Sequence, residues 1–146
     1  MSHDWGAPGT NCANHAVIKG INTALKEWGV VTWFDDEDNF GNIRQVMAHG
    51  VQSSAIFILF LTANYEAKVD STSGMDNCQA EFNNARSHLG TTRMLPVVME
   101  AAVRGRAWAG DLASLSQLLY VDAVGCDADA VAIKIIAELR RMQVYI

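Results

Sequence analysis

A cysteine and a glutamate three residues apart are the strongest chemical signal in this sequence. Cys78 and Glu81 follow Asp76, a good helix N-cap, and with Phe82 and Ala85 they predict one face of a helix. A glutamate with such apolar neighbours is expected at the border of the core, and the alternative is an ordinary solvated helix glutamate. No neighbouring base suggests an activated thiolate at Cys78, so a small buried hydrophobe is the better interpretation of that residue.

The remaining candidate ligands do not form a metal-binding pattern. Cys12, Cys78 and Cys126 are odd in number and widely spaced, which is typical of reduced thiols in a cytoplasmic protein. The acidic run 35–38 lacks the spacing of a calcium-binding EF-hand and is predicted to be a solvated loop. We therefore predict no metal site and no bound cofactor.

The familiar nucleotide-binding and phosphoryl-accepting motifs are also missing. The sequence has neither GxGxxG nor GxxxxGK[ST], and the loop after His3 is a poor phosphate cradle for a flavodoxin. A response-regulator receiver needs an aspartate at the end of its third strand, where this chain has Thr62. It also needs a lysine at the end of its last strand, where this chain has Asp122.

The composition excludes further classes of function. The 146 residues carry 11 Lys+Arg against 16 Asp+Glu, a net charge of −5, so no nucleic acid is expected as a partner. The longest strongly apolar run, 55–61, is far shorter than the roughly 20 residues that span a membrane. No leader is recognisable, and we expect a cytoplasmic protein without a membrane segment.

Strand-like and helix-like patterns alternate along the chain. Continuous apolar runs predict buried strands at 55–61 and 94–99, and shorter runs predict strands at 30–34 and 118–121. Stripes of apolar residues predict helices that cover the following segments: 17–28 with Asn14 as N-cap, 43–51, 78–85 after Asp76, and 131–142 after Asp127. This alternation predicts a single α/β domain over 1–146, a flavodoxin-like parallel sheet of four to five strands with helices on both faces.

In the loops at the carboxyl ends of these strands, where doubly wound proteins bind ligands, the sequence resembles the TIR (Toll/interleukin-1 receptor) domain. The motifs that carry the resemblance are, in chain order, Ser2 to Gly6, Trp33-Phe34-Asp35 with Gly41, Ala55 to Thr62 with Asn64-Tyr65, Cys78-x-x-Glu81, Leu95-Pro96-Val97-Val98, Trp108-x-Gly110 and Tyr120-x-Asp122. Each motif alone is weak, but their common order along the chain makes the resemblance specific.

The resemblance implies one of two functions. Catalytic TIR domains cleave the nicotinamide–ribose bond of NAD⁺ and carry a glutamate on the helix after the third strand, which is Glu81 here. The products would be nicotinamide and ADP-ribose or a cyclic ADP-ribose, in an immune or cell-death signalling role, with NAD⁺ as substrate. The alternative is a non-catalytic adaptor that acts through homotypic TIR–TIR contacts, and the glutamate at 81 favours the enzyme.

A single carboxylate suits this chemistry. Nicotinamide leaves as a neutral molecule, so the reaction needs little acid assistance, and positive charge develops on the ribose instead. A carboxylate held near the ribose hydroxyls, as Glu81 would be, orients them and stabilises that charge.

The resemblance also implies a set of substrate-binding residues. They are His3, Asp4 and Trp5 in the first loop, Trp33, Phe34 and Asp35 at the second strand end, Phe40 and Gly41 at the tip of the family's BB loop, and Cys78. For Trp33 the alternative is an ordinary core aromatic. In catalytic relatives the BB loop completes the site of a neighbouring subunit, so we expect self-association through this loop.

The first strand is expected to be short. A TIR domain normally has an apolar strand before Ser2-His3-Asp4, and here only Met1 stands there. Because that strand is internal in a flavodoxin-like sheet, its truncation is expected to leave a gap between its two neighbours.

Overall fold

The computed structural model describes residues 1–5, 13–34, 49–72 and 76–144. Its centre is a parallel sheet in the order β1-β2-β3, formed by β1 (Phe57–Leu61), β2 (Met94–Val98) and β3 (Val121–Asp122). All five residues of β1 and all five of β2 are buried, as expected of strands covered on both faces. The continuous apolar runs thus predicted the two central strands correctly.

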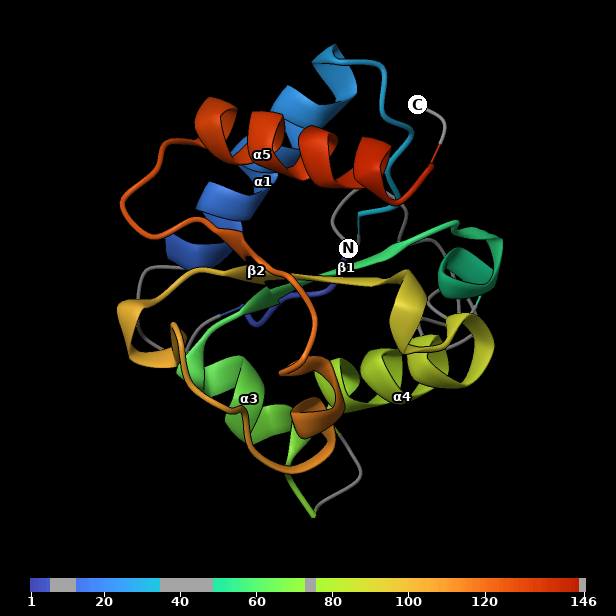
Figure 1. The fold of residues 1–146 in the computed structure, drawn as a ribbon, viewed down its shortest axis with the longest axis vertical. Helices are drawn as coiled ribbons and strands as arrows, with labels where there is room; N and C mark the ends of the chain where they lie inside the picture. The colour runs from blue at the N-terminus through green and yellow to red at the C-terminus, as the bar shows by residue number, and fades with distance from the viewer. Residues whose placement is uncertain (6–12, 35–48, 73–75, 145–146) are drawn as a thin grey trace.

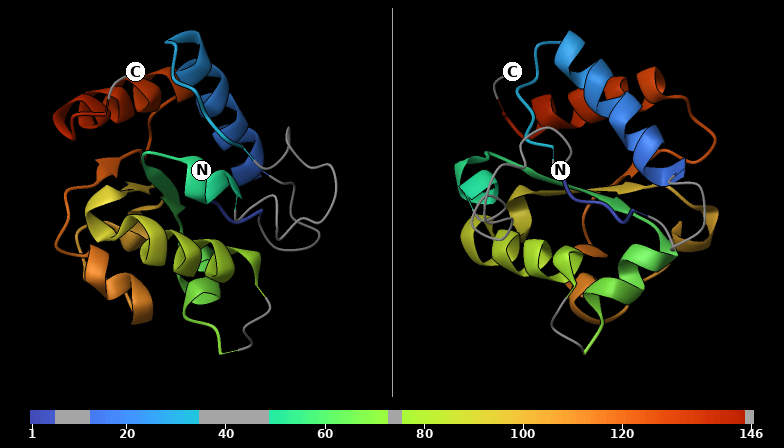
Figure 2. Two further views of the ribbon diagram at one scale, coloured as in Figure 1. Left: turned by 90° about the vertical axis from the view of Figure 1, so that its right-hand side faces the viewer. Right: turned by 180° about the vertical axis from the view of Figure 1, so that it is seen from behind.

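Helices cover both faces of the sheet (Figures 1 and 2). α1 (Ala13–Glu27) and α5 (Ala128–Arg141) pack against each other on one face, and α3 (Ala63–Val69) and α4 (Asn77–Leu89) lie on the other. Each face has its own apolar core, one around α1 and α5 and one around α3 and α4. The predicted flavodoxin-like α/β class is therefore confirmed.

Shorter segments complete the chain. Residues 49–53 are helical, which is the described part of the helix predicted over 43–51. Three 3₁₀ helices follow later, η1 (Thr91–Arg93), η2 (Ala101–Val103) and η3 (Gly110–Leu115). η3 packs against α3, so the loop between β2 and β3 covers the same face as α4.

The helix ends follow the sequence in two cases and depart from it in one. Asp76 and Asp127 cap α4 and α5, and their carboxylates accept from the backbone N–H of Cys78 and Ala130. The prediction of Asn14 as an N-cap was wrong, because α1 already begins at Ala13. The Asn14 side chain donates instead to the backbone carbonyl and the carboxylate of Asp4.

Pro96 lies in the middle of β2, not near its start as strand chemistry would suggest. The carbonyl of Val98 accepts from Ala123, so even-numbered residues of β2 turn their polar groups toward β3. β3 begins only opposite Val97, beyond Pro96. The nitrogen of Pro96 therefore faces the β3 side at a position that β3 does not reach, so the absence of an N–H costs the sheet no hydrogen bond to β3.

The first two predicted strands are reduced to single contacts. Ser2 makes an isolated parallel bridge with Leu59, by donating to Ile58 and accepting from Phe60. The prediction of a strand at 30–34 was wrong, since 31–34 form no ladder and Trp33 accepts one hydrogen bond, from the Met1 ammonium group, at 2.9 Å. Within the described residues the sheet thus has three strands and one bridge, fewer than the four to five expected.

A groove lies between residues 30–33 and the segment that leads into β1. It has a volume of about 370 Å³ and is lined by 30–33 on one side and by Ala55, Ile56 and Ile58 on the other. A second pocket, of about 460 Å³, adjoins it beside Arg93. Both lie at the amino ends of the strands, whereas ligands of doubly wound sheets bind at the carboxyl ends.

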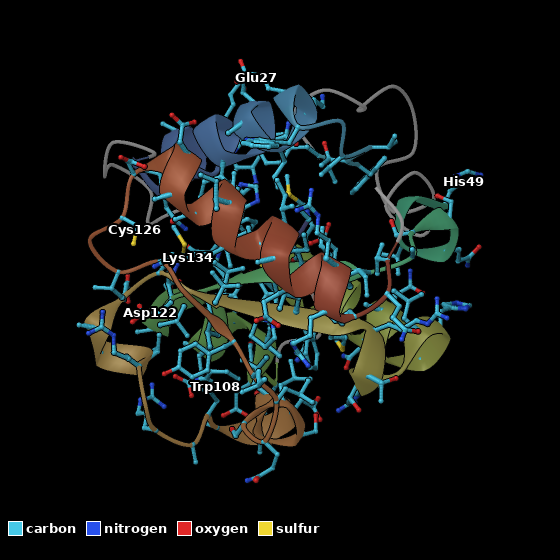
Figure 3. The ribbon with its side chains drawn as sticks, turned by 45° about the horizontal axis from the view of Figure 1, so that its top comes forward. Glu27, His49, Trp108, Asp122, Cys126 and Lys134 are labelled. Carbon is cyan, nitrogen blue, oxygen red and sulfur yellow. The ribbon has the colours of Figure 1, made fainter. Side chains whose placement is uncertain are left out.

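At the other edge of the sheet, α5 is fastened to the end of β3 by a lysine. Lys134 points toward Asp122 and Cys126 in Figure 3, and its ammonium group donates to the Asp122 carbonyl at 2.7 Å. The same group lies 3.1 Å from the sulfur of Cys126. This contact fixes the last helix of the domain over the carboxyl end of β3.

Candidate active site

Glu81 lies on the buried face of α4, toward the sheet. α4 turns Cys78, Glu81, Phe82 and Ala85 inward, and 7% of the Glu81 surface remains exposed. This is the border position that the sequence predicted. A carboxylate at such a depth needs hydrogen-bond donors around it, because burial of an unpaired charge is costly.

Ser2 supplies one of these donors. Its hydroxyl donates to Oε2 of Glu81 across 2.5 Å, and Oγ of Ser2 also lies 3.0 Å from the hydroxyl oxygen of Tyr65 in α3. Ser2 is 1% exposed and Tyr65 is fully buried. Three side chains from three separate parts of the chain therefore meet in one buried polar contact.

Cys78 lies one turn before Glu81 and is also buried. Burial raises the pKa of its thiol well above the usual range, and the neighbouring Asp76 carboxylate acts in the same direction. The sulfur lies 3.4 Å from the carbonyl oxygen of His3, to which the protonated thiol donates. Cys78 is thus a small packing residue and a weak donor, and its environment does not favour a thiolate.

Trp33 borders the same region from the other side. Glu81, Trp33, Met1 and Gly50 line a small pocket of about 10 Å³, enough for about one water molecule. A Cβ atom at Gly50 would lie 2.5 Å from the Trp33 ring, so only glycine allows this close approach. The indole is held against the helical segment 49–53 and near the carboxylate.

His3, Trp5 and Phe34 gather on the opposite side of the sheet plane, next to α1. Their rings stack with that of His15, and the Trp5 and His15 centroids are 4.0 Å apart at 17°. Nε2 of His3 and Nδ1 of His15 are 2.7 Å apart and share a hydrogen bond. Trp5 is 42% exposed, so this ring stack reaches the surface.

Asp4 connects the two sides. It is 2% exposed, and its carboxylate accepts from Thr62 at 2.5 Å and from Asn64 at 2.8 Å. Asn14 donates to the same residue from α1. Because Thr62 is also the N-cap of α3, Asp4 ties the starts of α1 and α3 to the carboxyl end of β1.

The predicted site residues thus divide into two groups. Glu81, Cys78 and Trp33 lie on the α4 side of the sheet, and the stacked rings of His3, Trp5 and Phe34 lie on the α1 side. Trp33 and Phe34 part in this way because successive residues of an extended chain point to opposite faces. Asp35, Phe40 and Gly41 lie outside the described residues.

Sequence reasoning missed several members of this arrangement. Ser2 and Tyr65 were noticed only as parts of motifs, although Ser2 is the hydrogen-bond partner of both Glu81 and Tyr65. His15 was not singled out, although it is central to the ring stack. The pairs are 12 to 79 residues apart, so periodicity gave no signal for them.

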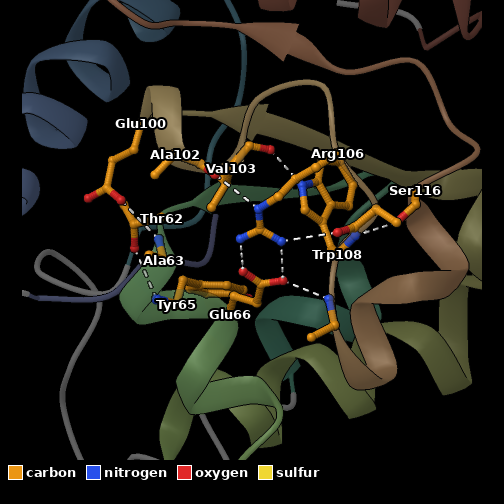
Figure 4. A network of polar contacts seen from close by, with 12 residues as sticks. Thr62, Ala63, Tyr65, Glu66, Glu100, Ala102, Val103, Arg106, Trp108 and Ser116 are labelled. Atoms are coloured by element: carbon orange, nitrogen blue, oxygen red, sulfur yellow. Dashed lines mark hydrogen bonds and ion pairs between the residues drawn. The ribbon is translucent and has the colours of Figure 1, made fainter.

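A second buried glutamate lies on α3. The carboxylate of Glu66 forms a two-armed ion pair with the guanidinium of Arg106, and its Oε1 also accepts from the backbone N–H of Ala109 at 2.6 Å (Figure 4). The hydrogen bond from Arg106 lowers the pKa of Glu66, against the effect of burial. This network holds the loop between η2 and η3 on the start of α3.

One comparison with known proteins identifies a family whose fold agrees with this structure. A family model described as TIR domain matches residues 4–136, which is most of the chain. The chain belongs to the TIR domain family. No curated protein and no solved structure matches it significantly. The fold and the family thus agree, and the TIR assignment brings the chain into a family of signalling domains that commonly self-associate.

Two further observations bear on this TIR domain. Across the residues that the structure describes, no group of three or more histidine, cysteine, aspartate or glutamate side chains could hold a metal ion. None of the described helices combines the length and the apolar character that crossing a bilayer requires.

Proposed function

We propose that this TIR domain cleaves the bond between nicotinamide and ribose in NAD⁺, with Glu81 as the catalytic carboxylate. The observation that carries the proposal is the environment of Glu81, a buried glutamate on α4 whose side chain accepts from Ser2 and borders a small pocket beside Trp33. The products are nicotinamide and ADP-ribose, or a cyclic ADP-ribose, and the role is in immune or cell-death signalling.

This reaction requires one negative charge close to the ribose. When the bond between C1′ and the pyridinium nitrogen breaks, its electron pair goes to nicotinamide, which leaves neutral, and C1′ becomes positively charged. The Glu81 carboxylate then stabilises this charge and orients the ribose hydroxyls. Water adds to C1′ and releases a proton to solvent, or the adenine ring of the same molecule adds instead and gives a cyclic product.

In this proposal the substrate-binding groups come from both faces of the sheet. The exposed ring of Trp5, stacked on His15, offers an aromatic surface for a nucleotide ring. Trp33 lies beside the catalytic carboxylate, while Asp4 holds the two helix starts in place. Asp35 belongs to the same strand-end loop in this proposal, and Cys78 keeps its place as a packing residue beneath the site.

The proposal includes assembly. The described residues leave room for about one water molecule next to Glu81, which is far less than a nucleotide needs. We infer that NAD⁺ enters an arrangement formed on self-association, to which Phe40 and Gly41 of the BB loop contribute from a neighbouring copy. Activity per molecule is then expected to rise with protein concentration across the association range.

The experiment is NAD⁺ loss and nicotinamide release, followed by chromatography for wild type and Glu81→Ala at high protein concentration and with a crowding agent. Glu138→Gln is the matched control, because Glu138 is a partly exposed glutamate of α5 that pairs with Arg141. We expect cleavage by wild type and Glu138→Gln and none by Glu81→Ala. Equal loss of NAD⁺ with all three proteins would reject Glu81 as the catalytic carboxylate. No loss with any of them would reject the proposed cleavage and favour the adaptor alternative, which acts through TIR–TIR contacts alone.

A further inference from the structure

Three buried side chains form a directed chain of hydrogen bonds that ends on Glu81. Ser2 comes from the segment next to β1, Tyr65 from α3 and Glu81 from α4, and they are 1%, 0% and 7% exposed. Two hydrogen bonds fix the backbone of Ser2: its N–H donates to the carbonyl of Ile58, and its carbonyl accepts from the N–H of Phe60. Its hydroxyl therefore has little freedom to move.

The direction of the chain follows from counting protons. A serine hydroxyl has one hydrogen, and Ser2 uses it toward Oε2 of Glu81, at 2.5 Å. The contact between Ser2 and Tyr65, at 3.0 Å, therefore has Tyr65 as the donor. The order is Tyr65 to Ser2 to Glu81, with both hydroxyl hydrogens directed toward the carboxylate.

Tyr65 can donate to Ser2 only while its hydroxyl is protonated. The buried position of Tyr65 favours this protonated form. Burial raises the pKa of Tyr65 well above the usual value, and the neighbouring Cys78 and Glu81 act in the same direction. Tyr65 is therefore a neutral donor at neutral pH. Burial also keeps the thiol of Cys78 protonated at neutral pH, so neither group adds a negative charge next to Glu81.

We propose that Tyr65 and Ser2 are positioning residues that keep the Glu81 carboxylate ionised and fixed in orientation for the reaction. This inference rests on the proposed function. Donors aimed at a carboxylate favour its charged form and offset the effect of burial.

The other charged and titratable groups around the three side chains are few in the described part of the chain. Asp76 and Cys78 come from α4, Lys68 from α3, and the Met1 ammonium group lines the pocket next to Glu81. Cations near a carboxylate favour its ionised form, and neighbouring anions oppose it. None of these groups is altered by the substitutions that follow.

The test measures the titration of Glu81 itself, so that it does not depend on turnover. Isotope-edited infrared spectra of protein with ¹³C-labelled glutamate carboxyls, minus those of Glu81→Gln, report its ionisation against pH. We expect Ser2→Ala to move the midpoint upward by about one pH unit, a tenfold change, because the carboxylate loses a charge-assisted hydrogen bond. Tyr65→Phe is expected to move it less, in the same direction.

The control is Thr32→Val, which removes a hydroxyl that donates to Asn22 at 2.5 Å on a separate part of the fold. It is expected to leave the Glu81 midpoint in place. In NAD⁺ cleavage, Ser2→Ala and Tyr65→Phe are expected to lower kcat more than they change KM, and to move the acid limb of the pH profile upward. Thr32→Val is expected to change neither.

The outcomes separate the two proposals. An unchanged midpoint in both Ser2→Ala and Tyr65→Phe, or an equal shift in Thr32→Val, overturns the positioning role even where wild type cleaves NAD⁺. If the Glu81 midpoint shifts in these variants but the wild type does not cleave NAD⁺, the result supports the effect of Ser2 and Tyr65 on Glu81 and rejects the proposed function. If Ser2→Ala does not fold, Tyr65→Phe decides, because it removes one oxygen atom and leaves the ring packing intact.

Discussion

Glu66 and Glu81 are buried to the same extent in this domain, 7% exposed each, but they are held in different ways. Glu66 meets the guanidinium of Arg106 and the N–H of Ala109, so its charge is offset by a cation. Glu81 accepts from the neutral hydroxyl of Ser2, a contact that orients the carboxylate. The first arrangement suits a structural contact and the second suits a group that acts on a substrate.

The residues around the two glutamates also differ. The Glu66 network joins α3 to the loop between η2 and η3, and Arg106 also donates to the carbonyls of Ala102 and Ala107. Trp108 closes this loop through its indole N–H to Val103. The contacts of Glu81 instead lead to Ser2 and to the small pocket that Trp33 and Met1 line.

The largest expected effect on stability is that of Glu66→Ala. It removes an ion pair and a backbone hydrogen bond from a buried position, and hydrogen bonds to charged groups contribute roughly 1–3 kcal/mol. We expect a loss of about that size in the free energy of unfolding, measured by urea denaturation. NAD⁺ cleavage per folded molecule should remain within about twofold of wild type. A loss of cleavage in a fully folded Glu66→Ala protein would remove the distinction between the two glutamates.

A smaller effect is expected from Arg106→Lys, which keeps the positive charge but not the planar fork. Lysine cannot make both contacts to the carboxylate and the contact to Ala102 at once. The free energy of unfolding should fall, but by less than in Glu66→Ala. If the two variants are equally unstable, geometry and not charge accounts for the whole contact.

The pH dependence of this contact has a definite sign. The hydrogen bond from Arg106 holds the pKa of Glu66 below its usual value. Its stabilising effect is therefore complete above about pH 4.3, the ordinary value for an unfolded glutamate, and is lost as the pH falls through the lower folded value. The difference in stability between wild type and Glu66→Gln should stay constant near neutral pH and shrink below about pH 4. Urea denaturation at a series of pH values measures it, and a difference that grows on acidification would contradict the assignment.

The smallest effect is expected at an exposed ion pair. Arg86 and Asp111 meet at 2.7 Å, but their side chains are 37% and 44% exposed. Such pairs contribute little, and Asp111→Asn should change the free energy of unfolding by less than about 0.5 kcal/mol. A loss as large as that of Glu66→Ala would mean that burial is not what distinguishes the Glu66 contact.

The sequence predicted well those features that depend on local pattern. The runs that became β1 and β2 are continuous and apolar, so their burial followed directly. Asp76 and Asp127 are caps because a side-chain oxygen two or three residues before a backbone N–H can reach it wherever the rest of the chain goes. α3 was not predicted, since 63–69 is too short to show a clear period, although Thr62 is the signal that marks its start.

Features that depend on distant partners were not predictable in this way. The segment 30–34 has the composition of a strand, but a strand forms only beside a neighbour, and here Met1 offers a single hydrogen bond. Glu66 and Arg106 are 40 residues apart, and nothing in the spacing of either one points to the other. For the site, the Cys78-x-x-Glu81 motif located the carboxylate, whereas the role of Ser2 became visible only once the fold had brought it to Glu81.

The most direct test of the account compares Glu81→Gln and Glu66→Gln in one experiment, under conditions in which wild type assembles. NAD⁺ cleavage per folded molecule and urea denaturation are measured for each. We predict that Glu81→Gln slows cleavage by at least about 100-fold and keeps its stability, while Glu66→Gln cleaves at the wild-type rate and is less stable. Cleavage by Glu81→Gln at the wild-type rate, or its loss only in Glu66→Gln, would contradict the account.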